Sequence, residues 1–91
     1  MVKIYQTFLM GEAQYKIHLT ERKEQADLWV YIVGNQGMSG KNGLWYLTEN
    51  FAESSAKVFF CAKGMSELSV CFVKNRSEAG WQTGHRFSML L

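Results

Sequence analysis

The sequence predicts a mainly β single domain of about six to seven short strands, which follow one another in repeats of about 10 to 17 residues. The first observation is that apolar side chains alternate with other residues after a small residue, and this pattern recurs along the chain. The second is that the chain contains no proline, so every backbone N–H stays available to a strand ladder. The third is that only residues 34–43 carry glycine at every third position, which predicts one long loop.

The clearest copy of the pattern lies in residues 25–33. Counted from Ala26, the side chains at plus two, plus four and plus six are Leu28, Val30 and Ile32, which share one face of a strand. The same count from Ala13, Ala56 and Ser66 reaches only apolar or aromatic residues: Tyr15, Ile17, Leu19, Val58, Phe60, Ala62, Leu68, Val70 and Phe72. We therefore expect these side chains to form the interior of the domain.

The strands and turns follow from this pattern in chain order. Strands are expected over residues 2–9, 15–20, 28–33, 44–48, 58–62 and 68–74. Residues 20–25 carry charged helix formers, which predict a single helical turn before Ala26, and residues 48–56 repeat that arrangement. Residues 63–65 form a turn, and residues 82–91 either extend a final strand or trail off.

The side chains between the apolar positions predict which strands are covered on both faces. Trp29 and Tyr31 make the second face of residues 28–33 apolar, and residues 58–62 are apolar on both faces in the same way. We therefore expect both strands to lie centrally. Lys16 and His18 give residues 15–20 a polar second face, which predicts a position towards an edge.

Length and charge predict one soluble domain spanning residues 1–91. Charged residues make up 20% of the chain and the net charge is +2, so neither disorder nor a strongly charged partner is indicated. The first ten residues are too polar for the apolar segment of a signal peptide, and no run reaches the roughly 20 apolar residues that span a bilayer. We expect a cytoplasmic monomer without membrane association, with Cys61 and Cys71 as reduced, largely buried thiols.

The residue types that carry chemistry do not form a recognisable motif. Cys61 and Cys71 with His18 and His85 could supply a thiol nucleophile and its base, or four metal ligands, but neither Cys-x-x-Cys nor His-x-x-x-His occurs. The carboxylates that could pair in acid–base chemistry all lie near turns, where capping is the commoner role: Asp27, Glu49, Glu53 and Glu67. We therefore expect no catalytic, cofactor-binding or metal-binding residue.

The glycine-rich stretch also departs from a phosphate-binding loop. Five residues separate Gly34 from Gly40, whereas a P-loop has four, and Lys41 is followed by Asn42 where a P-loop has Ser or Thr. We interpret residues 34–43 as a plain loop.

Aromatic and basic residues near one another in sequence predict a possible interaction surface. Its members are Lys41, Trp45, Tyr46, Lys74, Arg76, Trp81 and Arg86. Such a set could stack bases and contact phosphates of single-stranded nucleic acid. Aromatic residues at strand spacing are more often core, however, and a dedicated DNA-binding domain is usually more basic than this chain.

Several short segments together resemble the septoil-knot family, small bacterial domains whose backbone forms a seven-crossing knot. The resemblance lies in residues 25–31, 43–46, 66–70 and 78–81, and covers about residues 3–81. It implies a compact, knotted, mostly β domain, and it supplies no catalytic or ligand residues because the family's role is unassigned. Gln14, Gly40 and Lys57 stand where an acidic residue is typical, which puts a role for that position in doubt in those copies.

The functional expectation is a non-enzymatic, stable structural or protein-interaction module with an unidentified protein partner. The alternative is weak binding of single-stranded nucleic acid through the aromatic and basic clusters. A third hypothesis, a cysteine-dependent enzyme, requires a reactive thiol of low pKa.

Overall fold

The computed structural model describes residues 2–34, 43–85, 87 and 91. The seven strands are β1 (Val2–Gln6), β2 (Tyr15–Leu19), β3 (Leu28–Ile32), β4 (Leu44–Leu47), β5 (Ala56–Phe60), β6 (Leu68–Phe72) and β7 (Gly80–Trp81). The five 3₁₀ turns are η1 (Met10–Glu12), η2 (Lys23–Gln25), η3 (Phe51–Glu53), η4 (Lys63–Met65) and η5 (Arg76–Glu78). The predicted mainly β class is therefore confirmed. No helix in the described residues is long and apolar enough to cross a membrane.

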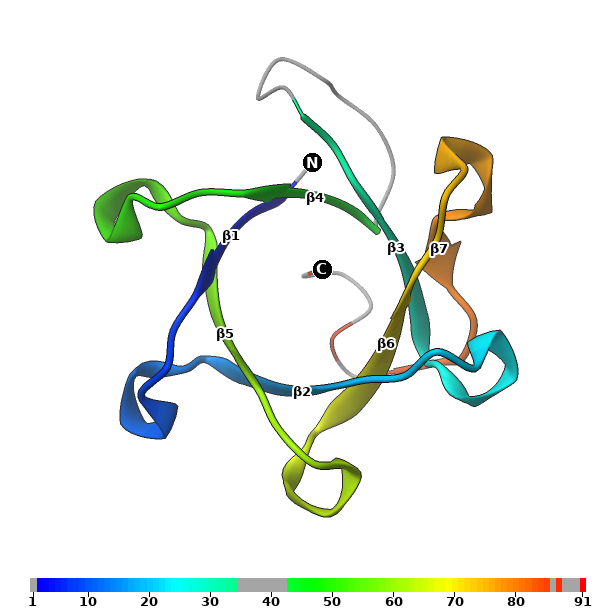
Figure 1. Cartoon of the computed structure of the whole chain (residues 1–91), viewed down its shortest axis with the longest axis horizontal. Helices are drawn as coiled ribbons and strands as arrows, with labels where there is room; N and C mark the ends of the chain where they lie inside the picture. The colour runs from blue at the N-terminus through cyan, green and yellow to red at the C-terminus, as the bar shows by residue number, and fades with distance from the viewer. Residues whose placement is uncertain (1, 35–42, 86, 88–90) are drawn as a thin grey trace.

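Strands β1 to β6 form a closed parallel barrel, seen nearly end-on in Figure 1. The order around the barrel is β4, β1, β5, β2, β6, β3, and a further pairing of β3 with β4 closes it. Each of the first three strands therefore lies between two of the last three. The short strand β7 pairs antiparallel with the beginning of β3, whereas β4 pairs with the end of β3.

The closed sheet corrects the prediction that residues 15–20 lie towards an edge. Strand β2 pairs with β5 on one side and with β6 on the other. Lys16 and His18 make its outer face polar because that face points away from the barrel interior. In a barrel, a strand can have a polar face without being an edge strand.

Each 3₁₀ turn ends at a small residue that leads towards the next strand. These residues, Ala13, Ala26, Ser54, Ser66 and Ala79, each donate the backbone N–H to the carbonyl of the first residue of the turn. The helical turns predicted within residues 20–25 and 48–56 are thus confirmed as η2 and η3. In the third counted copy the small residue is Ser54 rather than Ala56, because Ala56 already belongs to β5 and faces the core.

The inward-facing side chains of the barrel form three layers along its axis, because alternate residues of each strand face inward and the register places them at matching heights. The entry layer, at the amino-terminal ends of the strands, contains the side chains of Val2, Tyr15, Leu28, Ala56 and Leu68, and Gly43 stands at its sixth position without a side chain. The middle layer contains Ile4, Ile17, Val30, Trp45, Val58 and Val70, all of which are 0% exposed. The mouth layer, at the carboxyl ends, contains Gln6, Leu19, Ile32, Leu47, Phe60 and Phe72.

The interior predicted from the two-residue period is confirmed for the entry and middle layers. Leu28, Val30, Val58 and Val70 are all buried. The prediction is wrong at three of the four plus-six positions: Leu19, Ala62 and Phe72 are exposed, whereas Ile32 is half-buried against the core. Leu19 and Phe72 lie where their strands leave the barrel, and Ala62 lies beyond the end of β5.

Phe87 and Leu91, which follow β7, cover the amino-terminal end of the barrel, and the chain terminus lies inside the ring in Figure 1. Leu91 is fully buried, and its carbonyl oxygen accepts hydrogen bonds from the N–H of Gly43 at 3.0 Å and from Nε1 of Trp45 at 3.4 Å. The ring of Phe87 packs edge-on against Tyr15, with ring centres 4.8 Å apart. The described residues of this segment therefore form no further strand but close one end of the barrel.

Candidate interaction site at the open mouth of the barrel

The two ends of the barrel differ in what covers them. At the amino-terminal end, Phe87 and Leu91 pack onto the core. At the carboxyl end, large apolar side chains of the mouth layer reach solvent: Leu19 is 40% exposed, Leu47 46% and Phe72 43%. Ile32 and Phe60 of the same layer are half-buried. The carboxyl end is therefore an apolar surface, which we call the mouth.

Further residues surround the mouth two positions beyond the mouth layer. These rim residues are Phe8, Glu21, Gly34, Glu49, Ala62 and Lys74. The residues between the mouth layer and the rim still pair with the adjacent strand. Thr7, Thr20 and Thr48 each donate the backbone N–H to the carbonyl of a middle-layer residue on that strand. Phe8 is 81% exposed, the highest value among the large apolar residues of the described chain.

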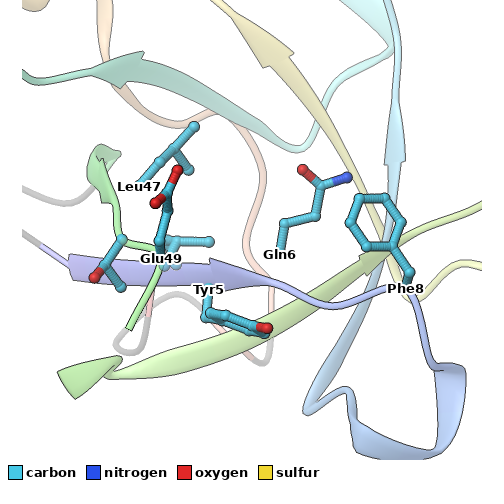
Figure 2. A pocket seen from close by; sticks show the side chains of 7 residues that line it. Tyr5, Gln6, Phe8, Leu47 and Glu49 are labelled. Carbon is cyan, nitrogen blue, oxygen red and sulfur yellow. The ribbon is translucent and has the colours of Figure 1, made fainter. Parts of the chain in front are cut away.

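Two hollows of about 410 Å³ open beside the mouth. The first lies between β1 and β4 and is lined by Ile4, Tyr5, Gln6, Phe8, Leu47, Thr48 and Glu49. In Figure 2, the side chains of Gln6, Phe8, Leu47 and Glu49 point to one side of β1, and that of Tyr5 points to the other. The second hollow lies between β2 and β6 and is lined by Leu19, Thr20, Glu21, Cys71 and Phe72. Both hollows combine an apolar mouth-layer residue with a rim carboxylate.

The surface predicted from aromatic and basic residues is only partly at the surface. Trp45 is 0% exposed, so its inclusion is wrong: its ring fills the middle layer and packs edge-on near Phe72, with ring centres 6.5 Å apart. Tyr46 is half-buried against the small cluster around Leu44. Trp81 is half-buried and stacks on His85, with ring centres 5.3 Å apart.

The basic members of that prediction have different positions. Lys74 and Arg76 are exposed in the connection after β6. Lys41 and Arg86 lie outside the described residues, as does most of the glycine-rich loop. Of the five predicted residues that the structure describes, only Lys74 stands on the rim of the mouth.

The cysteine and histidine residues that the structure describes do not gather into one group. Both thiols are free, with Cys71 buried and Cys61 half-buried. Nδ1 of His18 lies 3.3 Å from the carbonyl oxygen of Cys61, not from its thiol. Nδ1 of His85 accepts the N–H of Phe87, so its Nε2 donates to the carbonyl of Glu67 at 3.0 Å. The described residues contain no group of three or more His, Cys, Asp or Glu that could hold a metal ion.

One ion pair joins two of the outer turns. Lys23 of η2 pairs with Glu78 of η5, and the ammonium of Lys23 also lies 5.0 Å from the ring centre of Trp29. The hydrogen bond from Lys23, together with one from Asn75, lowers the pKa of Glu78 below its usual value. The pair links turns that follow β2 and β6, which are adjacent strands.

The sequence contains a signal for the mouth that the two-residue period does not capture. Leu19-Thr20-Glu21 and Leu47-Thr48-Glu49 repeat the same three residues at the ends of β2 and β4. The leucines lie in the mouth layer and the glutamates on the rim. Because all six strands of the barrel are parallel, both copies meet at the same end of it.

Comparison with protein families identifies a matching family. A family model described as a 7(1) septoil knot domain matches residues 1–82. The comparison with curated proteins and the comparison with solved structures gave no match.

Proposed function

Because the chain belongs to the septoil knot domain family, whose function is unassigned, we propose that it is a non-enzymatic protein-interaction module that binds its partner at the mouth. The observation that carries this proposal is the asymmetry of the barrel. One end is packed by Phe87 and Leu91, whereas the other presents Leu19, Leu47 and Phe72 to solvent. The interleaved strand order also fits the knot after which the family is named.

The mouth can contribute binding free energy because it exposes apolar area on a rigid frame. Fully burying an exposed leucine or phenylalanine yields about 1.5–3 kcal/mol, so a side chain that is already half-covered contributes about 1 kcal/mol. Phe8, Leu19, Leu47 and Phe72 together therefore supply several kcal/mol of gross attraction. The closed hydrogen-bonded barrel holds most of these side chains in place, which reduces the entropy lost on binding.

The partner that fits this surface is a protein segment presenting apolar side chains. The hollows of about 410 Å³ lie within the range of about 300–1,000 Å³ typical of small binding pockets. Each is open on one side and rimmed by polar groups, as the edge of an interaction surface usually is. The domain itself is expected to be a monomer.

Photo-crosslinking followed by affinity measurement tests the proposal. A benzophenone amino acid is placed at Phe8 on the rim, and as a matched control at Phe51, which is 45% exposed on η3 and outside the mouth. We expect a protein from the native lysate to be captured at position 8, but not at position 51, and to be displaced by unlabelled domain. Sedimentation of the purified domain alone measures whether it self-associates, which distinguishes a foreign partner from a second copy of this chain.

The captured protein is then purified and titrated against variants. Leu47→Gln and Phe72→Gln are expected to weaken binding about tenfold each, as central contacts of an interface do, and Phe51→Gln to change it less than twofold. Equal capture at both positions, or equal affinity of all variants, would overturn the proposal.

A further inference from the structure

The hollow between β1 and β4 joins an apolar wall to an acidic group. Leu47 and Phe8 supply the wall, and the Glu49 carboxylate and Gln6 amide face the same space in Figure 2. Neither polar side chain has a hydrogen bond to another residue that the structure describes. No lysine or arginine stands among the described lining residues. The hollow therefore carries negative charge beside apolar surface.

The equivalent glutamate on the other side of the mouth has different surroundings. Glu21 follows β2, and Lys74 follows the adjacent strand β6. Both line one further hollow, together with Lys23. Glu78 lines this hollow too and pairs with Lys23, so Lys74 is the cation that neighbours Glu21 there. Glu49 has Phe8 and Gly34 as its neighbours on the described rim, because β4 lies between β1 and β3.

Phe8 adds a second feature that favours a cation. Its side chain is 81% exposed, so its ring is open to an approaching group. An aromatic ring attracts an ammonium or guanidinium group placed over its face. The turn at η3 already contains such a contact, where Nζ of Lys57 lies 4.5 Å from the ring centre of Phe51.

Together these features match one kind of side chain, a long aliphatic stem that ends in a positive charge. We infer that the hollow between β1 and β4 takes a lysine or arginine of the partner, flanked in the partner by apolar residues that enter the mouth. The stem packs on Leu47 and Phe8, and the charged end reaches Glu49 and the amide oxygen of Gln6. This inference rests on the proposed function and specifies the chemistry of the partner.

Two matched peptides test the inference with the intact domain. One is an acetylated and amidated peptide of sequence Gly-Ser-Leu-Lys-Leu-Ser-Gly, and the other replaces its lysine with norleucine. Chemical-shift titration follows the backbone amides of Leu19, Leu47 and Phe72. We expect the lysine peptide to bind about three- to fivefold more tightly, the size typical of solvent-accessible charge and cation–π contacts, and this preference to shrink as salt is added.

Two variants locate the preference. Glu49→Gln, which keeps the shape of the side chain, is expected to remove most of the preference for lysine, whereas Glu21→Gln leaves that preference unchanged. Equal binding of both peptides to the wild-type domain, or an equal effect of the two variants, overturns the inference while leaving the proposed function standing. If neither peptide shifts these amides at millimolar concentration, the inference fails as well, and the crosslinking experiment decides the proposed function separately.

Discussion

Asp27 and Ser69 hold each other by two hydrogen bonds that run in opposite directions. The N–H of Asp27 donates to the carbonyl of Ser69 at 2.8 Å, and the N–H of Ser69 donates to Oδ2 of Asp27 at 2.9 Å. Glu67 forms the same pair of bonds with Lys16, and Gln14 forms it with Lys57. In these three copies the position after the small residue therefore uses a side-chain oxygen rather than a charge, since an amide also fills it.

Removing this side-chain oxygen is expected to destabilise the barrel. In Asp27→Ala, the N–H of Ser69 loses its hydrogen-bond acceptor. In the native barrel the Asp27 carboxylate accepts this bond in place of a backbone carbonyl, at the point where β3 begins. We expect a loss of about 1–2 kcal/mol in the free energy of unfolding, measured by urea denaturation. Asp27→Asn keeps an acceptor and should lose less.

The control for that experiment is Glu24→Ala, which removes an exposed carboxylate from the neighbouring turn η2. Such a surface change should alter stability by less than about 0.5 kcal/mol. Equal losses in the Asp27 and Glu24 variants would show that the paired hydrogen bonds contribute nothing measurable.

Gly43 cannot accept a side chain. Its φ is +91°, and an added Cβ would stand 2.7 Å from the backbone nitrogen of Gly80 and 2.7 Å from the carbonyl oxygen of Trp29. Both obstacles are backbone atoms of β7 and β3, so neither can rotate away. We expect Gly43→Ala to cost at least about 2 kcal/mol, measured by thermal and urea unfolding. Gly64→Ala is the control, because a Cβ there meets nothing within 4 Å, and it should leave stability unchanged or slightly raised.

Two residues on the same strand distinguish the middle layer from the mouth layer. Ile17 is 0% exposed and Leu19 is 40% exposed. We expect Ile17→Ala to cost about 3 kcal/mol, because it leaves a cavity in the centre of the barrel, and Leu19→Ala to cost about 1 kcal/mol or less. Urea unfolding of both variants measures the difference. Similar losses would mean that the mouth layer is as tightly packed as the interior.

The interleaved barrel is expected to unfold slowly. Strands from the two halves of the chain alternate around the ring, so neither half can separate without breaking pairings to the other. A knot in the backbone adds a further kinetic barrier to unfolding. The stability of such a protein is then measured by the lifetime of its native state. We expect the native state to persist for hours or longer in water, as measured by unfolding jumps in denaturant extrapolated to zero. A half-life shorter than about a second would contradict this expectation.

The strand phase was readable from residues such as Leu28 and Val30, because alternation is a local property of an extended chain. The helical turn before Ala26 was readable for the same reason, since charged helix formers and a small closing residue stand next to each other in sequence. The edge assignment of Lys16 and His18 failed because a polar outer face is compatible with a closed barrel. The position of Trp45 failed because nearness to Lys41 in sequence says nothing about which face of β4 a side chain occupies.

The sequence by itself determined that this is a mainly β domain, which residues alternate inward, and where the turns between strands fall. Only the tertiary structure decided that β1 to β6 close into one ring, that residues after β7 cover one end of it, and that Leu19, Leu47 and Phe72 meet at the other. The physical reason is that alternation depends on residues two apart. Strand pairing joins residues tens of positions apart, and exposure depends on how far along the barrel axis a side chain lies.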